Sequence, residues 1–405
     1  MTGLAAAQAG RPGDAVPPAT GPWRLLADDG TGAAEGVALD EALMARYARG
    51  EPDRPPTLRL YTYRTHCALV GRYQNLEAEV DLAACSRTGT QVSRRPTGGG
   101  AIIMGAGQLG VALAGRAPAG QRPRAIIEEL SAALVAGLAE LGITASFRGK
   151  NDLEAGGRKI AGLGLYVDQA GAMLFHASIL ADLDIPFMLQ VLRIPAAKLA
   201  GKAAAAVAER VTTVTEQTGR SWDGAALRHV AAAGFAATFG ATLERAEPDT
   251  AERRLASLLV TDRYAAQSWL GERSVSADGS GSALLKTPAG LARVYLTTHG
   301  DLVKSAMVAG DFNELPPAVV ALESALRWRR LDEKVVTEAV TAAGADAALG
   351  VPAERISAAV IAASRAAGER PPAVAPVRAR GSCYFPDLAG DSAPAQHAGQ
   401  RGREA

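Results

Sequence analysis

The chain has 405 residues, more than a single domain usually contains, so we expect two domains. Hydrophobic residues make up 48% of it and charged residues 21%, a balance that excludes global disorder and a fibrous architecture. Lysine and arginine number 43 against 42 aspartate and glutamate residues, so the net charge of +1 gives no overall field that favours nucleic acid or an anionic membrane.

The N-terminal region predicts a helix followed by two strands. Residues 1–21 are rich in Ala, Gly and Pro without periodicity, which indicates a disordered N-terminus. Apolar residues at helical spacing predict a helix over 37–49, with Gly36 in its cap region. Two stretches rich in β-branched and aromatic residues, 58–63 and 67–70, predict strands that pair with each other.

Hairpins and one long helix alternate through the middle of the chain. Strands are predicted at 101–104 and 109–114, after a glycine-rich turn. The strongly amphipathic stretch 123–141 predicts a helix that ends at Gly142. Short strands with glycine-containing turns follow over 146–184. This mixture favours an α+β fold, with a mixed or antiparallel central sheet flanked by helices, over a doubly wound parallel sheet.

The C-terminal region predicts a small α+β unit. Three β segments with turn signals between them lie within 282–312. Helical patterns follow at 317–327 and 353–367. From residue 370 onward the chain repeats the Ala-, Gly- and Pro-rich composition of the N-terminus, so we expect a disordered tail.

The segment RRPTGGG, residues 94–100, has the composition of an anion-binding loop. Three successive glycines let backbone N–H groups approach an anion closely, and the two arginines supply positive charge. The P-loop pattern is absent, and no helix begins directly after the glycines, as the dinucleotide fingerprint requires. A tight hairpin with exposed arginines explains the same composition equally well.

Lys159 lies in the run GRKIAG, between glycine-rich turns. An ammonium group there is a compact charge that can meet a carboxylate or a phosphate. The alternative, which the sequence alone favours, is a solvated lysine that protects an edge strand from aggregation. Asn151 and Asp152 carry groups that bind hydroxyls or Mg²⁺, yet Asn-Asp is equally an ordinary turn.

Four segments occur in an order and spacing that resemble lipoate-protein ligases of the lipoate/biotin ligase and octanoyltransferase superfamily: GRYQN (71–75), RRPTGGGAI (94–102), KNDLEAGGRKIAGLGL (150–165) and FHASILADLD (175–184). Residues 309–328 are similar to the accessory domain that follows the catalytic one in bacterial ligases. The organisation that we expect is a disordered N-terminus (1–21), a catalytic domain (22–245), an accessory domain (246–345), a helical extension (346–369) and a disordered tail (370–405).

The resemblance implies ATP-dependent ligation of lipoate in two steps. Lipoate and ATP, with Mg²⁺, would form lipoyl-AMP, and a lysine of an acceptor lipoyl domain would then take the acyl group. The implied acceptors are the E2 component of a 2-oxoacid dehydrogenase or the H protein of glycine cleavage. Lys159 matches the family's essential lysine, and Asp152 is the implied metal ligand. The implied binding residues for substrate and adenylate are Arg72, Arg95, Thr97, Gly98, Gly99, Gly100, Asn151, Asp152, Gly162, His176 and Ser178.

Departures from the family pattern keep two alternatives open. Met104, Gly105 and Gln108 stand where the family usually has polar and acidic residues, and His176-Ala177-Ser178 replaces a histidine-glycine-threonine run. The first alternative is a cysteine-independent transferase that moves lipoyl or octanoyl groups between carrier proteins without an adenylate. The second is a non-catalytic protein that binds lipoate or lipoylated domains, which the lost polar residues favour.

The cysteines bear on the choice because octanoyltransferases of this superfamily work through a thiolate. Cys67, Cys85 and Cys383 are far apart and odd in number, which argues against disulfides or a structural zinc site. We expect Cys67 and Cys85 to be buried and Cys383 to be exposed. The chain also lacks an 18-residue apolar run and an export signal, so we expect a cytoplasmic enzyme with no membrane or nucleic-acid partner.

Overall fold

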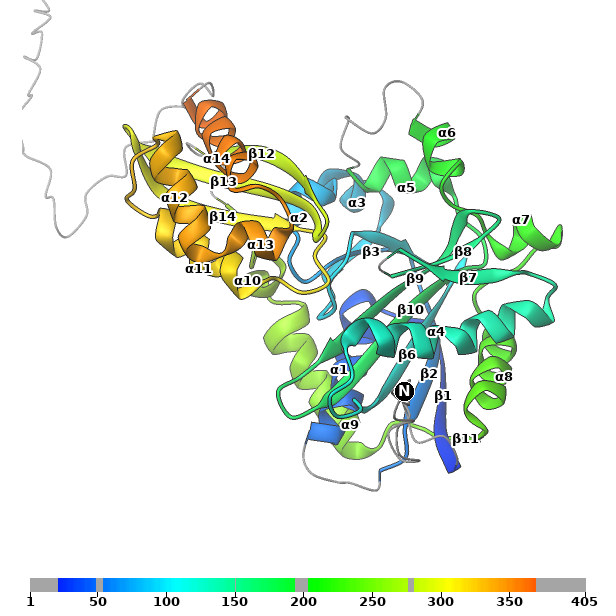
Figure 1. The fold of residues 1–405 in the computed structure, drawn as a ribbon. Helices are drawn as coiled ribbons and strands as arrows, with labels where there is room; N and C mark the ends of the chain where they lie inside the picture. Colours follow the sequence, from blue (N-terminus) through cyan, green and yellow to red (C-terminus); the bar gives the residue numbers. More distant parts are fainter. Residues whose placement is uncertain (1–20, 49–53, 150, 194–202, 276–279, 369–405) are drawn as a thin grey trace, which may run out of the picture.

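The computed structural model describes residues 21–48, 54–149, 151–193, 203–275 and 280–368. The predicted disordered ends, apart from the last residue of the N-terminal one, and Cys383 lie outside these residues, as does Lys150 of the third motif. Two α+β parts lie next to each other, a larger one that contains the N-terminal strand and a smaller one formed by the C-terminal elements (Figure 1).

An eight-stranded mixed sheet forms the centre of the larger part, with the strand order β11-β1-β2-β6-β10-β9-β8-β7. The neighbours β11, β1 and β2 run parallel, whereas every later pair is antiparallel. The predicted α+β fold with a mixed sheet is confirmed. The strands are β1 (Gly21–Thr31), β2 (Thr57–Tyr63), β6 (Gln108–Arg116), β7 (Ala145–Arg148), β8 (Asp152–Ala155), β9 (Arg158–Val167), β10 (Ala172–Leu180) and β11 (Ala241–Arg245).

Helices cover both faces of this sheet. Alternate residues of a strand point to opposite faces, so Leu58 and Leu60 of β2 pack against α4 (Pro123–Glu140) and α8 (Arg228–Phe239). Tyr61 and Tyr63 instead contact α1 (Ala33–Ala48) on the other face. The predicted helix over 37–49 is therefore real but begins earlier. Gly36 lies inside the helix rather than at its cap, because α1 begins at Ala33. Glycine is required there by the close packing, since an added Cβ would lie 3.0 Å from the Tyr63 ring.

The predicted pairing of 58–63 with 67–70 is wrong. Both edges of β2 are occupied by β1 and β6, and the chain leaves the large sheet after Tyr63. Residues 67–70 instead form the centre of a second sheet, β4-β3-β5. The elements of this layer are β3 (Cys67–Val70), β4 (Gln91–Arg94), β5 (Ile102–Met104), α2 (Leu76–Glu79), α3 (Leu82–Thr88) and α5 (Ile185–Val191). Two short helices, α6 (Ala203–Ala208) and α7 (Val214–Thr218), precede α8.

The smaller part is a three-stranded antiparallel sheet covered by helices, as its sequence predicts. Helix α14 packs against β12, and its Ile356 and Val360 share one core with Val294 of β13. The elements are β12 (Ser280–Thr287), β13 (Gly290–His299), β14 (Leu302–Gly310), α11 (Pro317–Leu326), α12 (Glu333–Ala343), α13 (Ala345–Leu349) and α14 (Ala353–Gly368).

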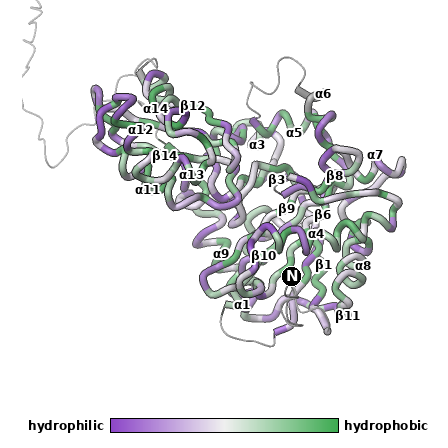
Figure 2. Tube along the Cα trace, viewed as in Figure 1, coloured by the Kyte–Doolittle hydropathy of each residue, from purple (hydrophilic) through white to green (hydrophobic). Residues whose placement is uncertain are grey.

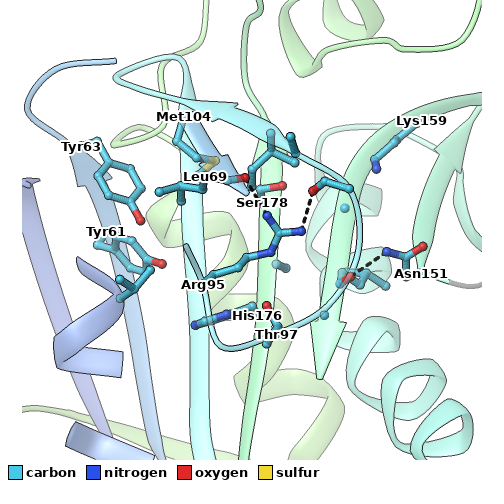
Figure 3. A pocket seen from close by; sticks show the side chains of 18 residues that line it. Tyr61, Tyr63, Leu69, Arg95, Thr97, Met104, Asn151, Lys159, His176 and Ser178 are labelled. Carbon is cyan, nitrogen blue, oxygen red and sulfur yellow. Dashed lines mark hydrogen bonds between the residues drawn. The ribbon is translucent and has the colours of Figure 1, made fainter. Parts of the chain in front are cut away.

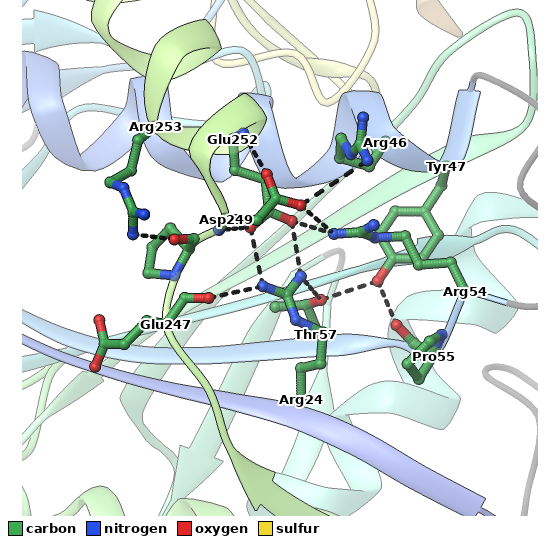
Figure 4. Close-up of polar contacts among 11 residues, drawn as sticks. Arg24, Arg46, Tyr47, Arg54, Pro55, Thr57, Glu247, Asp249, Glu252 and Arg253 are labelled. Carbon is green, nitrogen blue, oxygen red and sulfur yellow. Dashed lines mark hydrogen bonds and ion pairs between the residues drawn. The ribbon is translucent and has the colours of Figure 1, made fainter.

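Residues 249–270 connect the two parts and pack on the larger one. Glu252 of α9 (Thr250–Leu259) is fully buried, accepts a hydrogen bond of 2.7 Å from Arg24 of β1 and also pairs with Arg54 (Figure 4). A π-helical turn (Val260–Tyr264) and α10 (Gln267–Leu270) continue this packing. The predicted domain boundaries stay a prediction. This packing leads us to propose that the accessory unit begins after Val275 and includes α14.

Hydrophobic residues run along elements of both parts, for example α8 of the larger part and α11 of the smaller part (Figure 2). Among the described residues, none of the helices combines the length and apolar character needed to cross a membrane.

Candidate active site

A pocket of about 660 Å³, its mouth included, opens between the layer of β3 and β5 and strands β9 and β10 (Figure 3). Of the residues implied by the resemblance, Arg95, Thr97, Gly100, Asn151, Lys159, Gly162, His176 and Ser178 line it. The other lining residues, which the sequence did not single out for this pocket, are Val37, Tyr61, Tyr63, Leu69, Ala101, Ile102, Met104, Leu163, Gly164 and Ala177.

Strands β9 and β10 place three polar side chains on one wall. His176 and Ser178 point to the same face of β10 and lie opposite Gly164 and Gly162 of β9. An added Cβ at Gly162 would lie 3.1 Å from the Lys159 Nζ and 3.4 Å from the Ser178 hydroxyl, so glycine leaves the space in which these groups converge.

Lys159 is held at one end of the pocket. Its Nζ lies 2.6 Å from Oδ1 of Asp152, and both side chains are about one third exposed. Its backbone is fixed by hydrogen bonds with Arg210 and Thr212. Strand β9 lies between β8 and β10, so the alternative of an edge-strand lysine is wrong.

The two arginines of RRPTGGG have different surroundings, and neither is exposed. The Arg94 guanidinium donates to the carbonyl oxygens of Gly71, Arg72, Gln74, Trp269 and Leu270 at 2.6–3.2 Å, so it braces the loops around it rather than meeting an anion. Arg95 lines the pocket and donates to Leu69, Gly98 and Gly100 carbonyls at 2.6–3.0 Å.

Arg95 brings a positive charge to the pocket wall. Burial lowers the pKa of its guanidinium to about 10, which still leaves it charged at neutral pH. Its hydrogen-bond acceptors are neutral carbonyl groups, so its charge is not cancelled by a carboxylate among those partners. An anionic ligand would supply the missing negative charge.

The glycines of the loop are held by the smaller part. The Gly99 N–H donates to the Phe312 carbonyl at 2.8 Å, with φ at +90°. An added Cβ at Gly98 would overlap the same carbonyl oxygen. Gly98 and Gly99 therefore do not line the pocket, and the Gly99 N–H is already bonded rather than free for an anion. Gly98 lines a neighbouring cavity that Tyr73, Tyr166 and Glu314 also border.

Arg72 and Asp152 lie beside the pocket instead of lining it. Arg72 pairs with Glu272 and stacks over Trp269, with 4.2 Å between the guanidinium carbon and the ring centroid. Asn151 does line the pocket, and its side-chain amide donates to the Leu163 carbonyl at 3.1 Å. Within the described part of the chain, no cluster of three or more His, Cys, Asp or Glu side chains could hold a metal ion.

A buried charge network behind His176 was not predicted from the sequence. Asp40 of α1 is fully buried, and its carboxylate is 2.8 Å from Nε2 of His176 and accepts from Tyr61 at 3.0 Å and from Arg59 at 2.7 Å. Burial raises the pKa of Asp40, but the charge of Arg59 and the contact with His176 outweigh it and lower that pKa. The sequence does contain an indication of these buried charges, because Asp40 and Arg59 interrupt the apolar patterns VALDEAL and TLRLY.

Two buried hydroxyls in the pocket wall lack a well-formed hydrogen bond. Thr97 Oγ1 and Tyr63 Oη are enclosed, and neither makes such a bond within the described residues, although the Tyr63 hydroxyl interacts with that of Tyr61. A buried polar group without a partner is costly, so such groups commonly pair with something that the protein binds.

The predicted burial of Cys67 and Cys85 is confirmed. Burial raises the pKa of the Cys67 thiol to about 12 and also raises that of Cys85, which makes both poor nucleophiles. Neither lines the pocket. Of the residues that depart from the family pattern, Met104 forms part of the pocket wall, whereas Gln108 donates to the Asp182 carbonyl at 2.7 Å.

Comparison with known proteins gives consistent matches. The family model described as the lipoyl protein ligase A/B catalytic domain matches residues 33–236. The octanoyltransferase LipM of Symbiobacterium thermophilum is 33% identical over 272 residues, which cover 61% of this chain and 97% of that protein.

Two solved structures support the same relationship. A bi-partite lipoate protein ligase from Thermoplasma acidophilum, studied together with its E2 lipoyl domain, is 27% identical with a TM-score of 0.56 and covers 62% of this chain and 97% of its own. A lipoate-protein ligase A bound with ATP is also 27% identical, with a TM-score of 0.53, and covers 62% of this chain and 98% of its own.

Proposed function

The chain belongs to the lipoyl protein ligase A/B catalytic domain family, which makes it an enzyme of lipoyl or octanoyl transfer to proteins, and we propose that its specific reaction is ATP-dependent ligation of lipoate. In the first step a lipoate carboxylate oxygen attacks the α-phosphorus of ATP, and pyrophosphate leaves. In the second the amine of an acceptor lysine attacks the acyl carbonyl of lipoyl-AMP, AMP leaves, and an amide bond forms.

One observation carries this proposal: the pocket joins two cations, and none of its lining residues in the described part of the chain carries a thiol. Lys159 and Arg95 provide positive charge where a carboxylate and a phosphate must approach each other, and the same charge stabilises the oxyanion that develops during acyl transfer. A route through a free adenylate needs no covalent intermediate on the enzyme. The buried positions of Cys67 and Cys85 fit such a route.

The remaining pocket residues take supporting roles in this proposal. The Thr97 hydroxyl donates to the acyl or phosphate oxygen, and Asn151 and Ser178 border the adenylate. The glycines at 100 and 162 allow close approach of the ligand, and His176, oriented by Asp40, closes the wall. Three of the implied residues do not contact the ligand in this proposal and instead hold the glycine-rich loop in place: Arg72, Gly98 and Gly99.

Mg²⁺ enters this proposal together with ATP. It usually takes one or two carboxylates and completes its coordination with phosphates and water. Asp152 offers a single carboxylate beside the pocket, already 2.6 Å from Lys159, so it fits as a shared ligand of a nucleotide-bound ion and not as a protein-built metal site.

The proposed acceptor is a lipoyl domain, of a 2-oxoacid dehydrogenase E2 component or of the glycine cleavage H protein. The relative from Thermoplasma acidophilum, studied with its E2 lipoyl domain, supports this choice. A second candidate is acyl transfer between carrier proteins without an adenylate, which the similarity to an octanoyltransferase favours.

Intact-mass analysis of an acceptor lipoyl domain separates these candidates. We expect the acceptor to gain a lipoyl group only when ATP and lipoate are both present. Modification of the acceptor by an octanoylated carrier protein in the absence of ATP would contradict ligation and favour the transferase.

A further inference from the structure

The end of the pocket that lies away from Lys159 carries a polar group with no evident use in adenylation. Figure 3 shows Lys159 at one end of the pocket and Tyr61 and Tyr63 at the other. The walls beside the tyrosines are apolar and buried, formed by Val37, Leu69 and Met104. An acyl chain whose carboxylate lies near Lys159 would therefore extend toward the tyrosines, since the apolar walls are there.

The two tyrosine hydroxyls at this end differ in what they bind. Tyr61 donates to Asp40 at 3.0 Å, so its hydroxyl is occupied. Tyr63 is 2% exposed, and its hydroxyl interacts with that of Tyr61 but makes no well-formed hydrogen bond within the described residues. It lies next to α1, since an added Cβ at Gly36 would be 3.1 Å from the Tyr63 oxygen.

We propose that the Tyr63 hydroxyl selects the acyl chain, by favouring lipoate over octanoate. The hydroxyl is enclosed and lacks a full hydrogen-bond partner within the described residues, so a ligand atom that accepts from it would be favoured. The terminal methyl group of octanoate cannot accept a hydrogen bond, whereas a sulfur of the lipoate dithiolane ring is a weak acceptor. This inference rests on the proposed function, because it assumes that the carboxylate lies at the Lys159 end.

Tyr63→Phe is the direct variant, and Tyr295→Phe is its matched control. Tyr295 of β13 is also buried with an unpaired hydroxyl within the described residues, but it does not line the pocket. Binding of lipoate, octanoate and 6-thiaoctanoate, an octanoate analogue with sulfur in place of one methylene, is measured by calorimetry on the full chain without ATP.

We expect Tyr63→Phe to lower the preference for lipoate over octanoate by about 3- to 10-fold, as for the loss of one hydrogen bond. Lipoate should bind more weakly and octanoate equally well or more tightly. Tyr295→Phe should leave the preference unchanged. An unchanged preference in folded Tyr63→Phe, or an equal change in the control, would overturn the proposal.

The wild-type chain gives a second test that does not depend on the variant folding. It should bind 6-thiaoctanoate more tightly than octanoate, and equal affinities would overturn the proposal. Wild-type protein that binds neither acid would also overturn it. Binding with the expected preference but without adenylate formation would contradict only the proposed ligase function and leave the role of Tyr63 standing.

Discussion

Replacing Lys159 by alanine removes the ammonium at one end of the pocket. Loss of one preorganised electrostatic donor costs about 10²–10³-fold in turnover, equivalent to about 2.7–4 kcal/mol of transition-state stabilisation. Asp152 lies 2.6 Å away and would keep its negative charge beside the approaching carboxylate and phosphate. Repulsion between Asp152 and these two anions would add to the loss, so we expect a decrease in the upper half of that range. Water screens part of this repulsion, because both side chains are about one third exposed.

The assay is lipoyl transfer at saturating ATP, lipoate and acceptor lipoyl domain. Lys159→Arg should recover little activity, because a planar guanidinium does not replace a compact ammonium. Asp152→Ala should also lower turnover, because Asp152 is the proposed ligand of the nucleotide-bound ion. Thermal unfolding should change little, because neither side chain fills a core position.

Arg158→Ala is the matched control on the same strand. Arg158 is also a partly exposed cation with one acidic partner, since its Nη1 lies 2.7 Å from Oε1 of Glu216, but it does not line the pocket. Its removal should leave turnover within about twofold of the wild-type value and change the free energy of unfolding by less than about 1 kcal/mol, as for an exposed ion pair. Wild-type turnover in Lys159→Ala, or an equal loss in Arg158→Ala, would refute the catalytic role.

Three further predictions concern the thiols and the buried charges. Replacing all three cysteines by alanine should preserve most acyl transfer, because the described thiols are buried and lie outside the pocket; loss of transfer in a folded variant points to a thiolate mechanism. Asp40→Ala should lower the free energy of unfolding in urea by about 3 kcal/mol, because it deprives the buried Arg59 of a charged partner; a change below about 1 kcal/mol would contradict this. Burial raises the pKa of Glu252, but its bonds with Arg24 and the Asp249 N–H outweigh it and lower that pKa. The free energy of unfolding should therefore fall as pH decreases below about 4.5, and Glu252→Gln should weaken this pH dependence, measured by urea unfolding; the same pH dependence in both proteins would contradict a lowered pKa of Glu252.

The elements that the sequence predicts well are those defined by local patterns. The helix over Pro123–Glu140 follows from its apolar spacing, and the strands of the smaller sheet follow from alternation between turn residues. The partners of 58–63 could not be obtained in this way. Strand β1, one of its two neighbours, comes from a stretch with no distinct strand pattern, and the pairing spans more than thirty residues.

The candidate site shows the same division. Lys159, Thr97, His176 and Ser178 were identified from motif order, and they meet in one pocket. The orientation of Arg94 was not predictable, because the carbonyls that hold it include those of Trp269 and Leu270, about 175 residues further along the chain. Such long-range contacts leave no trace in the local pattern.

Exchange of labelled pyrophosphate into ATP tests the central claim, adenylation of lipoate by this pocket, most directly. Exchange reports the first step alone, so it needs no acceptor protein. We predict exchange that depends on lipoate, persists when the cysteines are replaced by alanine, and falls at least about 100-fold in Lys159→Ala. Absence of lipoate-dependent exchange in the folded wild-type protein, under conditions in which it still modifies a lipoyl domain, would contradict the ligase mechanism.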